Sequence, residues 1–134
     1  MASSIPKYLK KALTDVWATE TLYVALFNSS WTMPTDGKYS TTNEIAGTGY
    51  TAGGIELSAK TSSYVDTVNS VLDATNTAFT SVLLTGANAP RYAIVYETAT
   101  DLIRGAFDLG GNRTVTPTGN LTILWNGDGV IKVI

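Results

Sequence analysis

The sequence of 134 residues contains no cysteine and no histidine. This excludes disulfide bonds, thiolate or imidazole metal ligands, and nucleophilic sites of the Cys/His or Ser/His/Asp type. It also removes histidine, the commonest general base near neutral pH. The eleven carboxylates are scattered and form no recognisable acid/base motif. We therefore predict a chain that is not an enzyme and holds no cofactor or metal; carboxylates that converge in space are the remaining route to a hydrolase.

An excess of positive charge is also missing, because nine basic residues face eleven acidic ones for a net charge of −2. Such a balance argues against binding to nucleic acid or to an anionic membrane surface. No apolar run approaches the length of a membrane span or of a signal peptide. We expect a protein that is made in a cytoplasm and binds neither nucleic acid nor membrane.

The start of the chain predicts an amphipathic helix over residues 1–16, in which apolar residues recur every three or four positions between lysines. Its apolar stripe consists of Ile5, Leu9, Ala12, Leu13 and Val16. Two interpretations stay open: the helix packs on its own domain, or it is a basic arm that docks on a neighbouring subunit. Three of the six lysines lie here and the rest of the chain is acidic, which favours the arm. The partner-binding residues expected in this segment are Ile5, Lys7, Leu9, Lys10, Lys11 and Leu13.

The rest of the chain, residues 17–134, predicts a single domain built from strands. The run at residues 20–28 is apolar and compact, which is typical of a strand buried on both faces. Residues 54–61 alternate apolar and polar side chains, as a half-buried strand does. About seven such segments, with no second helical pattern, predict an all-β antiparallel sandwich or barrel with an N-terminal helix. The 21 threonines suit the half-exposed surfaces of such sheets.

A glycine-rich stretch at residues 47–54, "GTGYTAGG", raises the question of a phosphate-binding loop. It lacks the lysine and the following helix of a P-loop, and its glycine spacing does not match a dinucleotide fingerprint. Glycines also permit left-handed turns and bulges. We therefore predict that the stretch is a bend that leads into a strand.

The long segment between residues 28 and 54 has little periodicity but contains Trp31, Tyr39 and Tyr50. A loop of this length in a compact domain is usually functional or disordered, and aromatic residues argue against disorder. Trp and Tyr suit both sugar stacking and protein interfaces. The alternative is that these three side chains pin the loop to its own sheet.

The order of these features resembles a family of small structural proteins of tailed bacteriophages. The segments that carry the resemblance are "LYVALFNSSWTMPTD", "NEIAGTGYTAGGIELSAKT", "RYAIVYET" and "LTILWNGDGVIKVI". The family motif G-[ST]-G-Y-x-x-G-G is matched by Gly47, Gly49, Tyr50, Gly53 and Gly54. These motifs are structural and not catalytic.

The resemblance implies a virion component, with a capsid decoration or cement protein as the first expectation. The alternatives are a tail or head-tail junction protein, or a carbohydrate- or receptor-binding module of a tail. The implied partners are the major capsid protein or other virion proteins, and further copies of the chain itself. The implied location is the virion, after synthesis in the cytoplasm of a host bacterium.

Overall fold

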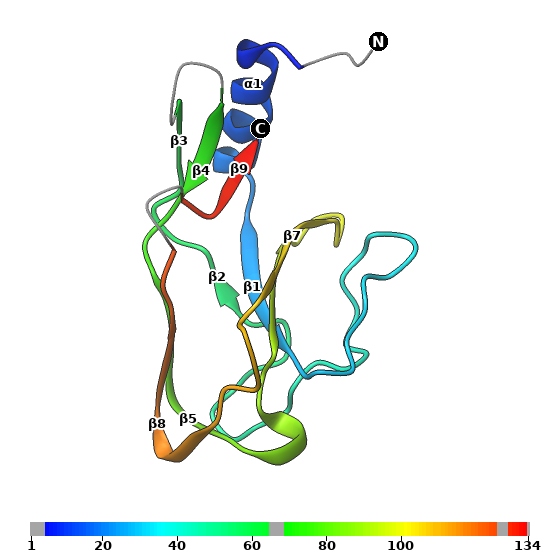
Figure 1. The fold of residues 1–134 in the computed structure, drawn as a ribbon, viewed down its shortest axis with the longest axis vertical. Helices are drawn as coiled ribbons and strands as arrows, with labels where there is room; N and C mark the ends of the chain where they lie inside the picture. The colour runs from blue at the N-terminus through cyan, green and yellow to red at the C-terminus, as the bar shows by residue number, and fades with distance from the viewer. Residues whose placement is uncertain (1–4, 65–68, 126–128, 134) are drawn as a thin grey trace. The chain divides into compact units, whose positions relative to one another are not determined.

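The computed structural model of the chain describes residues 5–64, 69–125 and 129–133. Their contacts divide the chain into two compact units, each of which is described by itself (Figure 1). The helical unit contains residues 1–20, 57–76 and 124–134, and the strand unit contains residues 21–56 and 77–123. The division expected from the sequence, an arm of residues 1–16 and a domain of residues 17–134, stays a prediction. In the structure, the N-terminal helix shares its unit with two later segments.

The helical unit consists of one helix packed against a small antiparallel sheet. The sheet has the order β3-β4-β9, and α1 contacts all three strands. Leu72, on the central strand, is fully buried, and its neighbour Val71 is also buried. The bounds of the elements are α1 Lys7–Thr19, β3 Thr61–Tyr64, β4 Ser70–Asp73 and β9 Ile131–Val133.

The strand unit contains a four-stranded antiparallel sheet of order β2-β1-β6-β7 and a two-stranded ribbon of β5 and β8. In the sheet, Val24 of β1 lies opposite Val95 of β6. A 3-10 turn, η1 (Gly86–Asn88), follows β5. The strand bounds are β1 Leu22–Phe27, β2 Ile55–Glu56, β5 Thr77–Leu84, β6 Tyr92–Glu97, β7 Ile103–Asp108 and β8 Val115–Ile123.

Strand β1 is an interior strand, and both of its faces are buried. Side chains alternate across a strand, so Val24 and Leu26 point to one face while Ala25 and Phe27 point to the other. All four are at most 1% exposed. The continuous apolar run is therefore explained by burial on both sides of the sheet, as the sequence predicted.

The prediction of an all-β fold with antiparallel sheets and an N-terminal helix is confirmed. One detail differs. The strand expected over residues 54–61 is shorter, because β2 covers only Ile55–Glu56. Ala59, farther along the same segment, adopts a left-handed φ of 53° that does not belong to a strand. Strand β8 begins at Val115 and includes Pro117 and Gly119, two residues that weaken the strand signal of the sequence.

The glycine stretch forms a tight bend against neighbouring backbone. Gly49 and Gly54 have φ values of 81° and 79°. A Cβ at Gly54 would overlap the carbonyl group of Val24, and one at Gly49 would overlap that of Ser81. The stretch leads directly into β2. Glycine is required here both by the positive φ and by the closeness of the next strand.

We predict that Gly54→Ala lowers the free energy of unfolding by clearly more than the roughly 1 kcal/mol of a left-handed alanine, because a strand must also move aside. The matched control is Gly37→Ala, since Gly37 has a φ of 67° but no atom within 4 Å of the point that a Cβ would occupy. Urea denaturation of both variants measures the difference. Equal losses would show that the close approach to Val24 carries no penalty.

Candidate functional site

The inner face of α1 packs against its own sheet and carries two buried polar side chains, followed one turn later by the half-buried Trp17 and Ala18. Thr14 is 0% exposed, and its Oγ1 shares hydrogen bonds with the hydroxyls of Ser62 at 2.6 Å and Ser70 at 3.1 Å. Lys10, one turn earlier, is 7% exposed and its Nζ donates to Asn69 Oδ1 at 3.3 Å. The contacts that attach α1 to its unit therefore include a cluster of satisfied polar groups.

Most of the apolar side chains of α1 point the other way. We call this surface the outer face; it consists of Ile5, just before the helix, and of Tyr8, Leu9, Ala12, Leu13 and Val16 on the helix. Tyr8 is 65% exposed, Leu9 47% and Val16 55%. A helix of a globular protein normally turns such a stripe toward its own core. In α1 the apolar stripe faces away from the sheet on which the helix packs.

The outer face leaves considerable stabilisation unused. Fully burying a Leu, Ile or Val side chain contributes about 1.5–3 kcal/mol, so a half-exposed one forgoes roughly 1 kcal/mol. Contiguous apolar surface that is rimmed by polar residues marks an interaction site more often than isolated exposed residues do. The outer face is therefore the strongest candidate for contact with another chain.

The charged residues of α1 make contacts within the helical unit. Lys11 Nζ donates to Asp15 Oδ1 at 2.6 Å, and this hydrogen bond is the main cause that lowers the pKa of Asp15. The ammonium groups of Lys7 and Lys11 lie 5.3 and 5.9 Å from the ring centre of Tyr64. Lys10, expected at an interface, is buried in the free chain and donates to Asn69 of its own unit.

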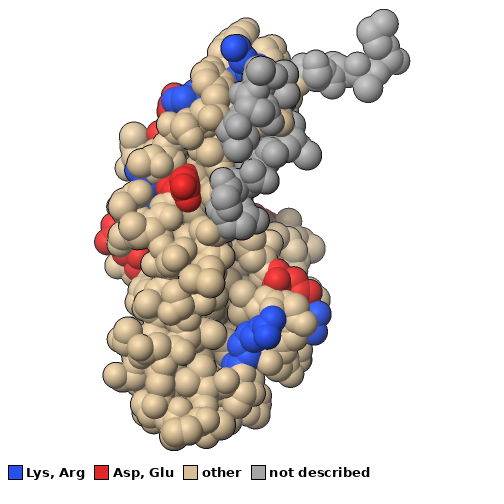
Figure 2. Space-filling model, turned by 60° about the vertical axis from the view of Figure 1, so that its left-hand side comes forward, with Lys and Arg blue, Asp and Glu red and all other residues tan. Residues whose placement is uncertain are grey.

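Most of the surface in view carries neither acidic nor basic side chains (Figure 2). This is consistent with the small net charge of the chain. Among the described residues, no helix combines the length and the apolar character needed to span a bilayer. A partner that bound the surface seen in Figure 2 would therefore contact mostly apolar and hydrogen-bonding groups, and few charged ones.

The aromatic loop of the strand unit is held against its own sheet. Trp31 packs on Phe27 and on Tyr92, with ring centres 5.8 and 5.6 Å apart. Tyr39 stacks on Tyr96 at 4.2 Å with an interplanar angle of 7°. These contacts place Trp31 and Tyr39 in the same layer as the buried aromatic core of the sheet.

A groove of about 230 Å³ lies beside Trp31. No charged residue lines it, and its volume and polar hydroxyls suit a small neutral ligand better than an anion. Its lining residues are Trp31, Thr32, Pro34, Ser40, Thr42 and Asn43.

The carboxylate of Glu44 is the centre of the loop. It accepts hydrogen bonds from the hydroxyls of Tyr39 and Tyr50, both at 2.7 Å, and from the backbone N–H of Gly53 at 2.8 Å. Tyr50 Oη in turn accepts from the N–H of Leu26 on β1 at 2.9 Å. Tyr39 and Tyr50, expected as partner-binding residues, thus pin the loop to its own strands.

Burial raises the pKa of all three tyrosines around this carboxylate. For Tyr39 and Tyr50 desolvation is the main cause of the upward shift, and the hydrogen bond to Glu44 adds to it. For Tyr96 desolvation and the nearby charge of Glu44 raise the pKa to about 12. The hydroxyls are therefore fixed as neutral donors, which suits a structural role and not a general base near neutral pH.

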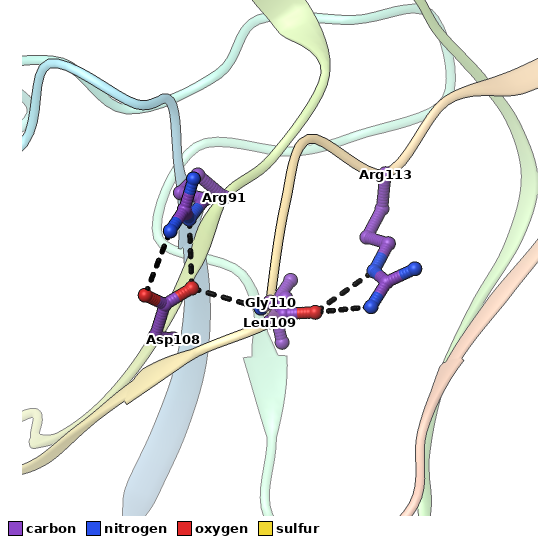
Figure 3. A network of polar contacts seen from close by, with 5 residues as sticks. All are labelled: Arg91, Asp108, Leu109, Gly110 and Arg113. Carbon is purple, nitrogen blue, oxygen red and sulfur yellow. Dashed lines mark hydrogen bonds and ion pairs between the residues drawn. The ribbon is translucent and has the colours of Figure 1, made fainter.

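A second polar cluster lies at the end of β7 (Figure 3). Arg91 pairs with Asp108 through two hydrogen bonds of 2.7 and 3.0 Å, and Asp108 also accepts from the N–H of Gly110. These bonds lower the pKa of Asp108 to about 2. Arg113 donates to the carbonyl of Leu109. Each group is used to shape the turn after β7, so the cluster is structural.

Two residues of these sites were not singled out by the sequence. Tyr8 lies three residues after Ile5 and one before Leu9, so the spacing of the stripe could have included it. Glu44 carries no such signal, because its partners come from both sides of a loop without periodicity. Within the described ranges, no group of three or more carboxylates is placed to hold a metal ion.

Comparisons of the chain with protein-family models, curated proteins and solved structures find no match.

We predict that Glu44→Gln lowers the free energy of unfolding by about 2 kcal/mol or more. A glutamine side chain has one acceptor oxygen, whereas Glu44 accepts three bonds, and bonds to a charged acceptor contribute about 1.5–3 kcal/mol each. The control is Glu56→Gln, an exposed position on β2, for which a change within about 0.5 kcal/mol is expected. Equal effects of the two substitutions in chemical denaturation would contradict the central role of Glu44.

We also predict that the protein loses stability above about pH 10. The folded-state pKa values of Tyr39, Tyr50 and Tyr96 lie above the unfolded value of about 10. Their contribution is therefore complete below that pH and is lost as the pH rises toward the folded values. Denaturation between pH 8 and 11 measures this loss, which should be smaller in Tyr50→Phe. A phenolate absorbance that rises with one midpoint near pH 10 for all seven tyrosines, in a still-folded protein, would disprove it.

Proposed function

We propose that this chain is a non-enzymatic structural protein of a tailed-bacteriophage virion, and that it decorates and stabilises the capsid shell. The observation that carries the proposal is the outer face of α1, which is apolar, contiguous and turned away from its own sheet. The resemblance of residues 47–54 to a motif of small phage structural proteins is the ground for choosing a virion.

A cement protein performs no reaction and needs only a rigid scaffold with surfaces that become buried in an assembly. The hydrogen bonds of Glu44 and the aromatic stacking of Tyr39 on Tyr96 make the long loop part of such a scaffold. Each contact can be weak, because repeated placement around the symmetry axes of a shell multiplies the attachment. The proposed partners are the major capsid protein or other virion proteins, together with further copies of the chain.

A tail or head-tail junction protein would use the same contacts at another place in the particle. Localising the protein in images of assembled particles separates these alternatives from the shell.

A second candidate function, carbohydrate recognition by a tail component, is favoured by the groove beside Trp31. Its uncharged lining combines an indole with three hydroxyl side chains, a combination that suits a neutral sugar ring. Binding to a glycan array that is lost when Thr42 is changed to Val, without attachment to shells, would favour this function instead.

We predict that the double variant Leu9→Asn, Leu13→Asn attaches to particles of the encoding phage at least about tenfold more weakly than the parent. Two leucines that no longer contribute roughly 1 kcal/mol each account for this factor. The expected measurement is co-sedimentation of purified protein with particles that lack it.

The matched control is Leu124→Asn, a leucine that is 73% exposed and lies outside α1. Both proteins should unfold at temperatures close to that of the parent, because none of the three leucines is buried. Undiminished attachment of the double variant would overturn the proposal.

A further inference from the structure

Aromatic side chains follow one another without a break on one face of the four-stranded sheet. In order of contact, this ring series consists of Tyr92, Trp31, Phe27, Tyr39, Tyr96 and Tyr23. Neighbouring ring centres lie between 4.2 and 6.4 Å apart, and all of the rings belong to the strand unit. Such packing stabilises the sheet. Rings this close together also let an electron pass from one to the next.

The ring series meets solvent at Trp31. This side chain is half-buried, whereas Phe27, which separates it from Tyr39, is only 1% exposed. Because the sequence has no cysteine, indoles and phenols are the side chains that lose a single electron most readily. An oxidant that removes an electron from Trp31 therefore leaves a radical that one buried ring separates from Tyr39.

Tyr39 combines its place in the ring series with a proton acceptor. A phenol that loses an electron also loses its hydroxyl proton, because the oxidised phenol is a very strong acid. The hydroxyl of Tyr39 donates to Glu44 Oε1 at 2.7 Å, which is within the range for direct proton transfer. Its ring also stacks on Tyr96 with an interplanar angle of 7°, so a second electron-rich ring lies parallel to the one that becomes oxidised.

The other nearby tyrosines lack one of these two features. Tyr96 donates its hydroxyl to a backbone carbonyl oxygen, which is a much weaker base than a carboxylate. Within the described ranges, Tyr23 and Tyr92 donate to no carboxylate. Tyr50 shares Glu44 with Tyr39, but its ring packs against β5, outside the ring series. Only Tyr39 therefore has both a path for the electron and a base for the proton among these tyrosines.

We propose that Tyr39 is a redox site, at which an oxidising equivalent that enters the strand unit at Trp31 comes to rest. The oxidant belongs to the class of one-electron inorganic radicals. The site goes beyond the proposed shell function and does not depend on it, because no residue of the outer face takes part.

The reaction has two steps. In the first, the oxidant takes one electron from Trp31 and is reduced to its anion, while the indole N–H releases its proton to water. In the second, the indolyl radical takes one electron from Tyr39 and recovers a proton from water, which restores the indole. The Tyr39 hydroxyl passes its proton to Glu44, which becomes a neutral carboxylic acid. The products are a phenoxyl radical on Tyr39 and the reduced oxidant.

Pulse radiolysis with the azide radical tests the proposal, because this oxidant attacks indoles in preference to phenols. In the parent, the absorption of the indolyl radical should convert into that of a phenoxyl radical at a rate that does not depend on protein concentration. Tyr39→Phe keeps the ring but removes the hydroxyl, and should slow the conversion several-fold. Glu44→Gln, which removes the proton acceptor, should slow it to a similar extent.

The matched control is Tyr92→Phe. Tyr92 contacts Trp31 directly, with ring centres 5.6 Å apart, yet its removal should leave the rate of conversion almost unchanged. A conversion that is slowed by Tyr92→Phe and not by Tyr39→Phe would place the radical on Tyr92 and overturn the proposal. A rate that Glu44→Gln leaves unchanged would also overturn it, since the carboxylate would then take no proton.

Nitration of the parent protein gives a second readout that requires no variant to fold. One nitrogen dioxide radical removes the electron, and a second adds to the tyrosyl ring as a nitro group, while the displaced ring hydrogen returns to the phenol oxygen. Exposure alone predicts nitration at Tyr8 and Tyr64, which are 65% and 44% exposed. The proposal predicts that peptide mass spectrometry finds it mainly on the half-buried Tyr39. Nitration that follows exposure would contradict the redox site.

Discussion

The hydroxyl of Thr14 decides which side of α1 is turned outward. Buried polar groups need partners, and the surface that the small sheet offers to the helix includes the hydroxyls of Ser62 and Ser70. Rotating the helix to bury Leu9 and Leu13 would separate these three groups and place apolar side chains against hydroxyls. The satisfied polar contact therefore holds the helix in the orientation that exposes its apolar stripe.

In the strand unit, hydrogen bonds to a polar side chain likewise fix the position of a segment, in this case the long loop. A loop of more than twenty residues has little backbone pairing of its own, yet a single carboxylate, Glu44, gathers two tyrosine hydroxyls and a glycine N–H around it. Because Tyr50 also contacts the backbone of β1, the loop is tied to the interior of the sheet. The groove beside Trp31 thus lies on a fixed surface, as a binding or assembly surface requires.

Patterns that depend on neighbours in sequence were predictable, and those that depend on distant partners were not. The apolar run of β1 and the bend at Gly54 follow from local composition and backbone sterics. The orientation of α1 depends on Ser62 and Ser70, which lie some fifty residues away. The role of Glu44 depends on tyrosines at irregular spacing. Ala59 adopts a left-handed backbone conformation, which an alanine in a strand-like pattern gives no reason to expect.

An exposed apolar face is tolerable in a free protein only if it does not drive indiscriminate association. On α1 the face is narrow, and the paired side chains of Lys11 and Asp15 lie along one side of it. An unrelated apolar surface that covered the face would desolvate this pair without adding partners for it, which is unfavourable. A surface with apolar residues at matching levels and opposite charges at its edge satisfies both requirements. The charges therefore supply selectivity, while the apolar side chains supply the free energy of the contact.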